Sequence, residues 1–186
     1  MSVETVSLGC RLNFAEAETI ARGAPRGEEW IVVNSCAVTN EAVRQTRQAI
    51  RRARRRRPDA RILVTGCAVE LTPASFRAMP EVDRVVGNGR KISAFGAKES
   101  VPAGSHARVR SFVAVQTGCD HRCTFCSIWT ARGPSVSYPF EAIRDAIARE
   151  IDCGAKEIVL TGVDITDYAG GLGALCQRLL AAEPRL

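Results

Sequence analysis

The chain has 186 residues, of which 46% are hydrophobic and 25% charged, and its net charge at pH 7 is +6. This composition is ordinary for a globular protein, and the length fits one large or two small domains. No apolar run is long enough for a membrane span, and the N-terminus lacks the layout of a secretion signal. We therefore expect a cytoplasmic protein that does not contact a membrane.

The first part of the chain repeats one pattern, in which a short β-branched run ends at a cysteine. The three runs occupy residues 4–10, 30–36 and 61–67 and end at Cys10, Cys36 and Cys67. Helical patterns at 13–22 and 40–57 follow the first two, and a further strand is expected at 84–87. This alternation predicts an α/β fold with a doubly wound parallel sheet, whose strand exits lie on one edge. We therefore expect the three thiols to converge there as a ligand set, although each alone would be interpreted as a core thiol.

The helix expected over 40–57 is unusually rich in arginine. A polyanion is the natural partner for such a concentration of positive charge, and a solvated helix face is the alternative. The candidate RNA-binding residues are Arg44, Arg47, Arg51, Arg54 and Arg55.

The character of the sequence changes near residue 97. Glycine, proline and small polar residues predict a linker over 98–108, between a domain of residues 1–97 and one of residues 109–186. Beyond the linker we expect a strand at 111–116, a helix that begins at Pro139 and ends at Gly154, a strand at 157–161 and a helix at 171–182. These are the first β/α units of a barrel. A full barrel takes roughly 200 to 250 residues, so we expect an incomplete one, with a marginal second domain and a first domain that folds alone.

The most informative motif is a loop with the spacing Cys-x3-Cys-x2-Cys, within QTGCDHRCTFCSIWTARG. Its ligands would be Cys119, Cys123 and Cys126. Three thiolates on one loop can hold three irons of a cubic iron–sulfur cluster and leave the fourth iron open to a substrate. A zinc site with His121 as fourth ligand is the alternative.

The remaining two of the eight cysteines are Cys153 and Cys176. They fall outside any ligand spacing, so we interpret them as small buried hydrophobic residues. Disulfides are not expected, because the chain is large enough to fold without them.

With Phe125 before the last cysteine, the loop resembles the signature of the radical S-adenosylmethionine (SAM) enzymes. With both cysteine groups in view, the chain resembles the N-terminal half of the radical SAM methylthiotransferases. The resemblance is carried by SLGCRLNFAEAE, VVNSCAVTNEAVRQTRQAIRR, VTGCAVEL, the cysteine loop and EIVLTGVD. Together with AMPEVDRVVGN, the second of these segments is most similar to the branch that acts on N6-threonylcarbamoyladenosine in tRNA.

This resemblance implies an enzyme with two [4Fe-4S] clusters and SAM as cofactor, in which an incomplete radical-SAM barrel follows the parallel-sheet domain. Cys119, Cys123 and Cys126 would hold the cluster that cleaves SAM. The other three cysteines would hold an auxiliary cluster whose open iron carries the sulfur. The implied reaction adds a methylthio group to C2 of N6-threonylcarbamoyladenosine, 3′ to the anticodon. A reductant protein would supply electrons to the clusters.

The resemblance also assigns Arg132, Gly133 and Gly162 to the cofactor pocket. Tyr138 and Asp164 depart from the family, which commonly has Arg and Asn there. The alternatives are the same chemistry on isopentenyladenosine or on an aspartate of a ribosomal protein, an inert truncated metal-bound RNA-binding fragment, and an electron carrier. The arginine-rich helix disfavours the last.

Overall fold

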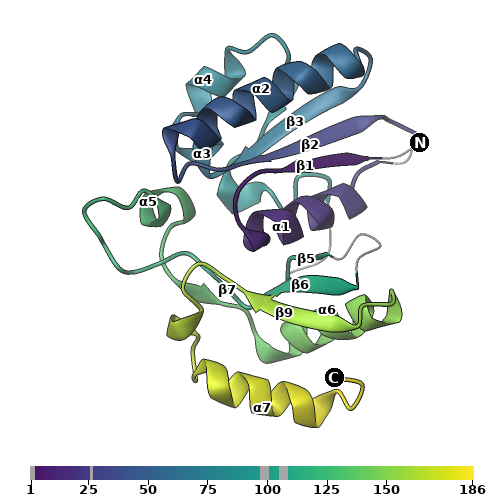
Figure 1. The fold of residues 1–186 in the computed structure, drawn as a ribbon, viewed down its shortest axis with the longest axis vertical. Helices are drawn as coiled ribbons and strands as arrows, with labels where there is room; N and C mark the ends of the chain where they lie inside the picture. Colours follow the sequence, from purple (N-terminus) through teal and green to yellow (C-terminus); the bar gives the residue numbers. More distant parts are fainter. Residues whose placement is uncertain (1–2, 26, 97–100, 105–108) are drawn as a thin grey trace.

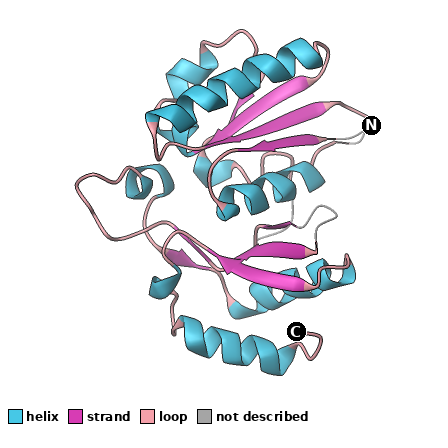
Figure 2. Ribbon diagram, in the orientation of Figure 1, coloured by secondary structure: helices cyan, strands magenta, loops and turns pink. Residues whose placement is uncertain are grey.

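The computed structural model describes residues 3–25, 27–96, 101–104 and 109–186, which form alternating layers of helices and sheets. From one end of the molecule to the other, the layers are α2, a first sheet, α1, a second sheet, and then α6 and α7 (Figure 1). Figure 2 shows the same alternation by type of secondary structure. We call residues 3–96 the first half and residues 101–186 the second half.

The first sheet is parallel and contains β1 (Glu4–Ser7), β2 (Trp30–Ser35), β3 (Arg61–Gly66) and β4 (Arg84–Val85), in that order. Every residue of β2 is buried, as expected for a strand covered on both faces. Ile50 of α2 (Asn40–Arg56) packs in one core cluster with Ile31. Ile20 of α1 (Arg11–Arg22) packs in another cluster with Val32, so the two helices cover opposite faces. The predicted α/β fold with a doubly wound parallel sheet is confirmed.

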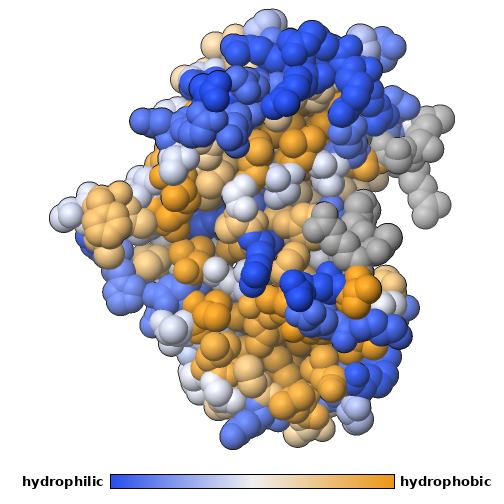
Figure 3. Space-filling model, viewed as in Figure 1, coloured by the Kyte–Doolittle hydropathy of each residue, from blue (hydrophilic) through white to orange (hydrophobic). Residues whose placement is uncertain are grey.

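Helix α2 has one buried face and one charged face. Thr39 caps its N-terminus by accepting a hydrogen bond from the N–H of Ala42 at 3.0 Å. Thr46, Ile50 and Ala53 are buried, and the arginines lie on the remaining surface. Hydrophilic side chains accordingly cover the α2 end of the molecule, at the top of Figure 3.

Three short helices and two 3-10 turns were not expected from the sequence. They are α3 (Cys67–Leu71), α4 (Pro73–Arg77), α5 (Ile128–Arg132), η1 (Asn88–Arg90) and η2 (Ile165–Asp167). Helix α3 follows β3 directly and η1 follows β4, and all five stretches are too short for a helical hydrophobic period to be visible.

Helix α1 is shared by the two halves. Its buried residues face both sheets, because the second sheet covers the side of α1 that the first sheet leaves open. Phe14 meets Phe112 edge to face, with 5.7 Å between ring centroids. Gly104 lies so close to α1 that a Cβ atom on it would be 2.4 Å from the Cβ of Glu18. The two halves are therefore packed tightly against each other.

The second sheet contains β5 (Ala103–Gly104), β6 (Arg110–Ala114) and β9 (Glu157–Thr161). Strands β6 and β9 are parallel, and β5 is antiparallel to β6. Helices α6 (Phe140–Asp152) and α7 (Leu172–Ala182) cover the face away from α1 and pack together in one core. The two expected β/α units, with strands β6 and β9, are present.

Strand β5 lies in the stretch where the sequence predicted a linker. Val101 and Ala103 are buried, because this short segment pairs with β6 and packs against α1. Ala103 and Gly104, which lie in the expected linker of residues 98–108, are thus part of the second sheet. Residues 97–100 and 105–108 lie outside the described residues.

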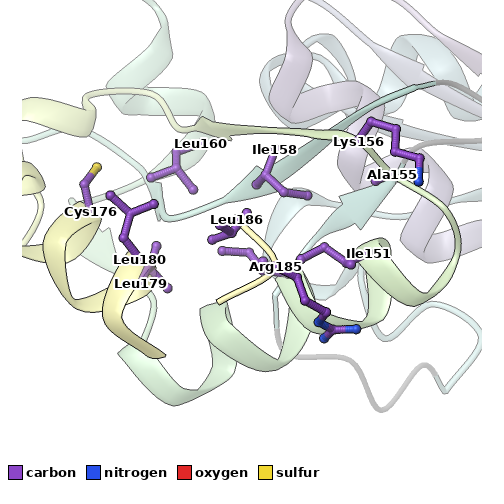
Figure 4. Close-up of a pocket in the computed structure, with 11 residues that line it drawn as sticks. Ile151, Ala155, Lys156, Ile158, Leu160, Cys176, Leu179, Leu180, Arg185 and Leu186 are labelled. Carbon is purple, nitrogen blue, oxygen red and sulfur yellow. The ribbon is translucent and has the colours of Figure 1, made fainter. Parts of the chain in front are cut away.

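The second sheet borders an apolar cavity of about 660 Å³ (Figure 4). Strand β9 provides Ile158 and Leu160 to it, and α7 provides Leu179 and Leu180. Only the last residue of β9 is buried, whereas every residue of β2 is buried. Strand β9 is therefore less well covered than β2.

The interpretation of Cys153 and Cys176 as buried thiols was wrong. Cys153 is exposed because it follows the last turn of α6, where the chain leaves the core. Cys176 is half-buried and lines the apolar cavity. Among the described helices, none combines the length and apolar character that a membrane crossing requires.

Candidate functional site

The cysteines of the first half lie at the exits of three neighbouring strands. We call Cys10, Cys36 and Cys67 the first cysteine group. Cys36 and Cys67 are buried and Cys10 is exposed. Gly9 has a φ of +99°, and a Cβ atom on it would lie 2.7 Å from the sulfur of Cys36. Glycine at this position therefore allows the turn that carries Cys10 to approach the turn that carries Cys36.

Two polar side chains fasten these turns together. The side-chain amide of Asn13 donates to the carbonyls of Leu8 at 2.8 Å and Ser35 at 2.9 Å. The hydroxyl of Ser35 donates to the carbonyl of Thr65 at 2.6 Å and accepts from the N–H of Val69 at 3.3 Å. The exits of β1, β2 and β3 are thus joined by hydrogen bonds at the edge where the sequence predicted that they meet.

The second cysteine group, Cys119, Cys123 and Cys126, lies on a loop over residues 118–135, which we call the cysteine loop. The short strands β7 (Gln116–Thr117) and β8 (Val136–Ser137) pair on either side of it. The N–H of Ile128 donates to the sulfur of Cys126 at 3.4 Å. Gly118 has a φ of +75°, and a Cβ atom on it would overlap the carbonyl oxygen of Pro134 at 1.8 Å, so only glycine fits there.

Gln116 connects the cysteine loop to the exit of β9. Its buried side-chain amide donates to the carbonyl of Gly118 at 2.8 Å, and its oxygen accepts from the N–H of Asp164 at 2.9 Å. A Cβ atom on Gly162 would lie 2.9 Å from the Gln116 carbonyl oxygen, which explains the small residue there. Gly133, the C-cap of α5, accepts from the N–H of Cys119 at 3.1 Å.

His121 is engaged by a carboxylate of the β9 exit. Its Nε2 lies 3.0 Å from Oδ2 of Asp164. The hydrogen bond from Thr166 is the largest effect on the pKa of Asp164 and, together with the weaker effect of His121, holds it below its ordinary value although burial raises it. This pairing ties the tip of the cysteine loop to the second sheet.

The two cysteine groups lie on neighbouring segments. Helix α3 begins at Cys67, α5 begins two residues after Cys126, and α3 packs against α5. The amide of Asn88 also donates to the carbonyl of Ala131 at 2.5 Å. Both groups therefore lie at the same end of the layers, beside α5 in Figure 1.

The chemistry of the donor sets fits iron–sulfur clusters. All six residues are free thiols, and thiolates are the ligands that such clusters use. The N–H that points at Cys126 is a typical partner of a cluster-bound sulfur. Within the described residues, no three Cys, His, Asp or Glu side chains are gathered closely enough to hold a metal ion. Each group would therefore have to draw together around its cluster.

A buried ionic cluster lies between the two halves. Glu16 of α1 meets Lys91 at 2.6 Å and Arg132 of α5 at 2.8 Å. Burial raises the pKa of Glu16, but the charges of Lys91 and Arg132 outweigh it and lower that pKa to about 2. Burial lowers the pKa of Lys91 despite the opposing charge of Glu16. These three residues line a polar cavity of about 230 Å³, together with Asn88, Gly89, Ile92, Thr117 and Tyr138.

Arg132 was expected in the cofactor pocket because of the resemblance. Its side chain is only 3% exposed, and its guanidinium donates to Glu16 and to Oδ1 of Asn13. Two of the partners of Arg132 thus belong to the first half of the chain, and its remaining hydrogen bond is to Thr117 in the second half.

Sequence reasoning missed Asn13, Glu16, Lys91 and Gln116. Glu16 offered one signal, since it is a charged residue between Ala15 and Ala17 in a helix. The signal was ambiguous, because the pairing of Glu16 with Lys91 and Arg132 depends on how the two halves pack.

The five candidate RNA-binding arginines differ in their surroundings. Arg51 and Arg55 line a shallow surface depression of about 370 Å³ together with Gln48 and Arg52. Arg44 forms two hydrogen bonds with Glu41 on the exposed surface. Arg47 donates to Ser75 and lies over the ring of Phe76, 5.6 Å from its centroid.

Arg54 is bound by backbone carbonyls of the first half. Its guanidinium donates to the carbonyls of Pro58 at 2.7 Å, Ala60 at 2.8 Å and Glu81 at 2.9 Å. It also contacts Oδ2 of Asp83 at 2.5 Å. The side chain therefore holds the end of α2 against the loop before β4.

Comparison with known families matches both halves. Residues 2–87 match the model of the uncharacterized protein family UPF0004, and residues 113–183 match that of the radical SAM superfamily. The chain is 36% identical to the threonylcarbamoyladenosine tRNA methylthiotransferase MtaB of Rickettsia prowazekii, over 98% of this chain and 50% of that protein. The MtaB of Thermotoga maritima is 32% identical, over 96% and 48%. The ribosomal protein uS12 methylthiotransferase RimO of Carboxydothermus hydrogenoformans is 28% identical, over 88% and 44%. The chain spans about half the length of the curated relatives it matches.

Proposed function

The chain belongs to the radical SAM methylthiotransferase family. We propose that it provides the two cluster-binding sites of an enzyme that acts on threonylcarbamoyladenosine in tRNA. The observation that carries the proposal is the placement of the two cysteine groups. Asn13 and Ser35 join the three cysteine-bearing strand exits, and α5 packs the cysteine loop beside α3. A reaction that needs two clusters near one substrate requires such proximity.

In this proposal each cysteine group holds one [4Fe-4S] cluster. When bound, a cluster with one iron free of protein ligands supplies an open coordination position and an electron. The second group would serve the cleavage of SAM, and the first group would serve sulfur transfer. The N–H of Ile128 stabilises negative charge on the sulfur of Cys126. Gln116 holds the cysteine loop at the exit of β9, where Gly162 leaves room for close approach.

The substrate class is inferred from the relatives. The MtaB proteins of Rickettsia prowazekii and Thermotoga maritima are 36% and 32% identical to this chain, whereas the RimO of Carboxydothermus hydrogenoformans is 28% identical. The addition of a methylthio group to C2 of threonylcarbamoyladenosine is therefore favoured over modification of a ribosomal protein. A cytoplasmic setting, with a reductant protein as electron source, completes the proposal.

The outer face of α2 would contribute to tRNA binding. Arg51, Arg52 and Arg55 surround one surface depression, whereas Arg54 is held by backbone carbonyls. We therefore place the RNA contact on the first three. Neutralising about three phosphates would give a slope of log K against log salt of about −2 to −3.

Iron and sulfide analysis after anaerobic reconstitution tests the two clusters. We expect about eight irons per chain, because each cubic cluster contains four. Replacing all three cysteines of either group with alanine lowers this to about four, and only the loss of the second group abolishes cleavage of SAM under a strong reductant. The exposed Cys153 provides the control, since Cys153→Ala retains about eight irons. Zinc alone, or iron that survives loss of both groups, would contradict the proposal.

Binding to tRNA is tested separately. The triple variant Arg51→Gln, Arg52→Gln, Arg55→Gln should bind about tenfold more weakly at low salt and show a slope shallower by about 2 to 3. The control removes the same charge from the second half by Arg110→Gln, Arg144→Gln, Arg178→Gln. Equal loss of affinity in both variants would show that net charge, rather than the α2 face, governs binding.

A further inference from the structure

The buried ionic cluster between the halves has more positive than negative charge. Glu16, Lys91 and Arg132 have side chains no more than 4% exposed. One carboxylate therefore faces two cations within this cluster. Buried charges are costly unless they are paired and hydrogen-bonded, so the contacts of this cluster constrain how the two halves sit against each other.

Arg132 connects the cysteine loop to the first half. It lies on α5, six residues after Cys126, and donates to Glu16 at 2.8 Å and Asn13 at 2.5 Å. It also donates to the hydroxyl of Thr117 on β7 at 3.3 Å. A planar guanidinium can satisfy several acceptors in fixed directions, which an ammonium group cannot do.

Asn13 carries this connection to the first cysteine group. While its oxygen accepts from Arg132, its amide nitrogen donates to the carbonyls of Leu8 and Ser35. Ser35 directly precedes Cys36, and Leu8 lies two residues before Cys10. One side chain thus separates the guanidinium of Arg132 from two cysteine-bearing turns.

A second path returns to α5. Lys91 donates to Glu16 at 2.6 Å and to the side-chain oxygen of Asn88 at 2.8 Å. The amide of Asn88 donates to the carbonyl of Ala131, the residue before Arg132. The polar contacts therefore form a closed ring across the two halves, and breaking one member affects the others.

We propose that Arg132 is a positioning residue that, through Asn13, holds the turns of Cys10 and Cys36 in place relative to the cysteine loop. The inference rests on the proposed function, in that it assumes a cluster bound by the first cysteine group. The excess positive charge of the ionic cluster would favour the anionic thiolates of such a cluster. Burial lowers the pKa of Arg132, but Glu16, followed by negative charge at Cys67 and Cys10, raises it above its ordinary value.

The test uses the full chain with Cys119, Cys123 and Cys126 replaced by alanine, so that only the first group can hold a cluster. In this parent we compare Arg132→Gln and Arg132→Lys, after circular dichroism has established that each is folded. The readouts are the rate of iron release to bathophenanthroline disulfonate and the electron paramagnetic resonance spectrum of the reduced cluster. We expect Arg132→Gln to release iron about 10- to 100-fold faster, with a changed spectrum.

Lysine separates geometry from charge. Arg132→Lys keeps the positive charge but cannot reach Glu16 and Asn13 with a planar fork, so we expect it to release iron faster than the parent as well. Arg110→Gln is the control, because Arg110 forms an exposed ion pair with Glu157 at 2.7 Å within the second half. It should leave both readouts unchanged.

A milder variant keeps the test decisive if Arg132→Gln does not fold. Asn88→Ala removes the bonds to Ala131 and Lys91 without removing a buried charge, and we expect a smaller change in the same direction. The inference would be overturned if Arg132→Gln folds and shows the release rate and spectrum of the parent. If Arg132→Gln does not fold, the same result in Asn88→Ala would overturn it. Parental release rates and spectra in Arg132→Lys would also overturn it, because the positive charge alone would then be sufficient. If the parent itself binds no cluster, the proposed function fails instead.

Discussion

The two sheets of this molecule differ in how completely they are covered. All six residues of β2 in the first sheet are buried, whereas only the last residue of β9 in the second sheet is. Helices lie on both faces of the first sheet, and the second sheet borders a cavity of about 660 Å³. The lower half of the view in Figure 3 accordingly shows many hydrophobic side chains at the surface.

This difference extends to the cysteines. The first group lies at the exits of β1, β2 and β3, so the parallel sheet brings these residues to one edge, where Asn13 and Ser35 fasten the turns. The second group lies on a loop whose position depends on single side chains, above all Gln116. Both sites depend on specific side-chain contacts, but only the first also has a parallel sheet that brings its three cysteines to one edge.

The largest expected effect compares equivalent isoleucines of the two sheets. Ile62 in β3 is fully buried, whereas Ile158 in β9 is partly exposed and lines the cavity. Ile62→Ala should lower the free energy of unfolding by about 4 kcal/mol, because it leaves a cavity in a closed core. Ile158→Ala should cost about 1 to 2 kcal/mol. Urea denaturation measures both, and equal losses would contradict the difference in coverage.

The second effect concerns the ionic cluster that joins the halves. The pKa of Glu16 is about 2 in the folded protein, against an ordinary value of 4.5. A carboxylate with a lowered pKa stabilises the fold above its ordinary pKa, and this contribution is lost as the pH falls toward the folded value. We expect a loss of about 3 kcal/mol between about pH 5 and pH 2, at about 1.4 kcal/mol per pKa unit.

The control for this pH dependence is Glu16→Gln. The variant should be less stable than the wild type at neutral pH, because Lys91 and Arg132 lose their buried counter-charge. The difference in unfolding free energy between the two proteins should shrink as the pH falls from 5 to 2. A constant difference over this range would show that Glu16 does not account for the acid sensitivity.

Much of the fold could be predicted because hydrophobic periodicity reports local structure. Strand β9 lies where the sequence placed it, and α2 ends one residue before its predicted end. Helices α3 and α5 were missed because five residues are too few to show a period. Strand β5 was missed because pairing with β6, rather than its own sequence, makes it a strand.

The cysteines of the candidate site could be predicted from spacing, but their supporting contacts could not. The position of Cys36 after a β-branched run is a local signal, whereas the bonds of Asn13 join residues from different strands. The packing of α1 between both sheets also could not be inferred, since a helix shared by two halves has the same sequence pattern as a buried one. Because α1 is shared, we now expect the halves to unfold together rather than separately.

The smallest effect distinguishes two arginines of α2 that sequence reasoning treated alike. Arg54 donates to the carbonyls of Pro58, Ala60 and Glu81, whereas Arg55 lines a surface depression. Arg54→Ala should lower the free energy of unfolding by about 2 kcal/mol, because charged donors are lost to acceptors that are partly buried. Arg55→Ala should change it by less than about 0.5 kcal/mol, as surface substitutions usually do. Urea denaturation gives both values at one salt concentration. If Arg55→Ala proved as costly as Arg54→Ala, the outer face of α2 would be serving the stability of the first half, and its assignment to RNA would lose its basis.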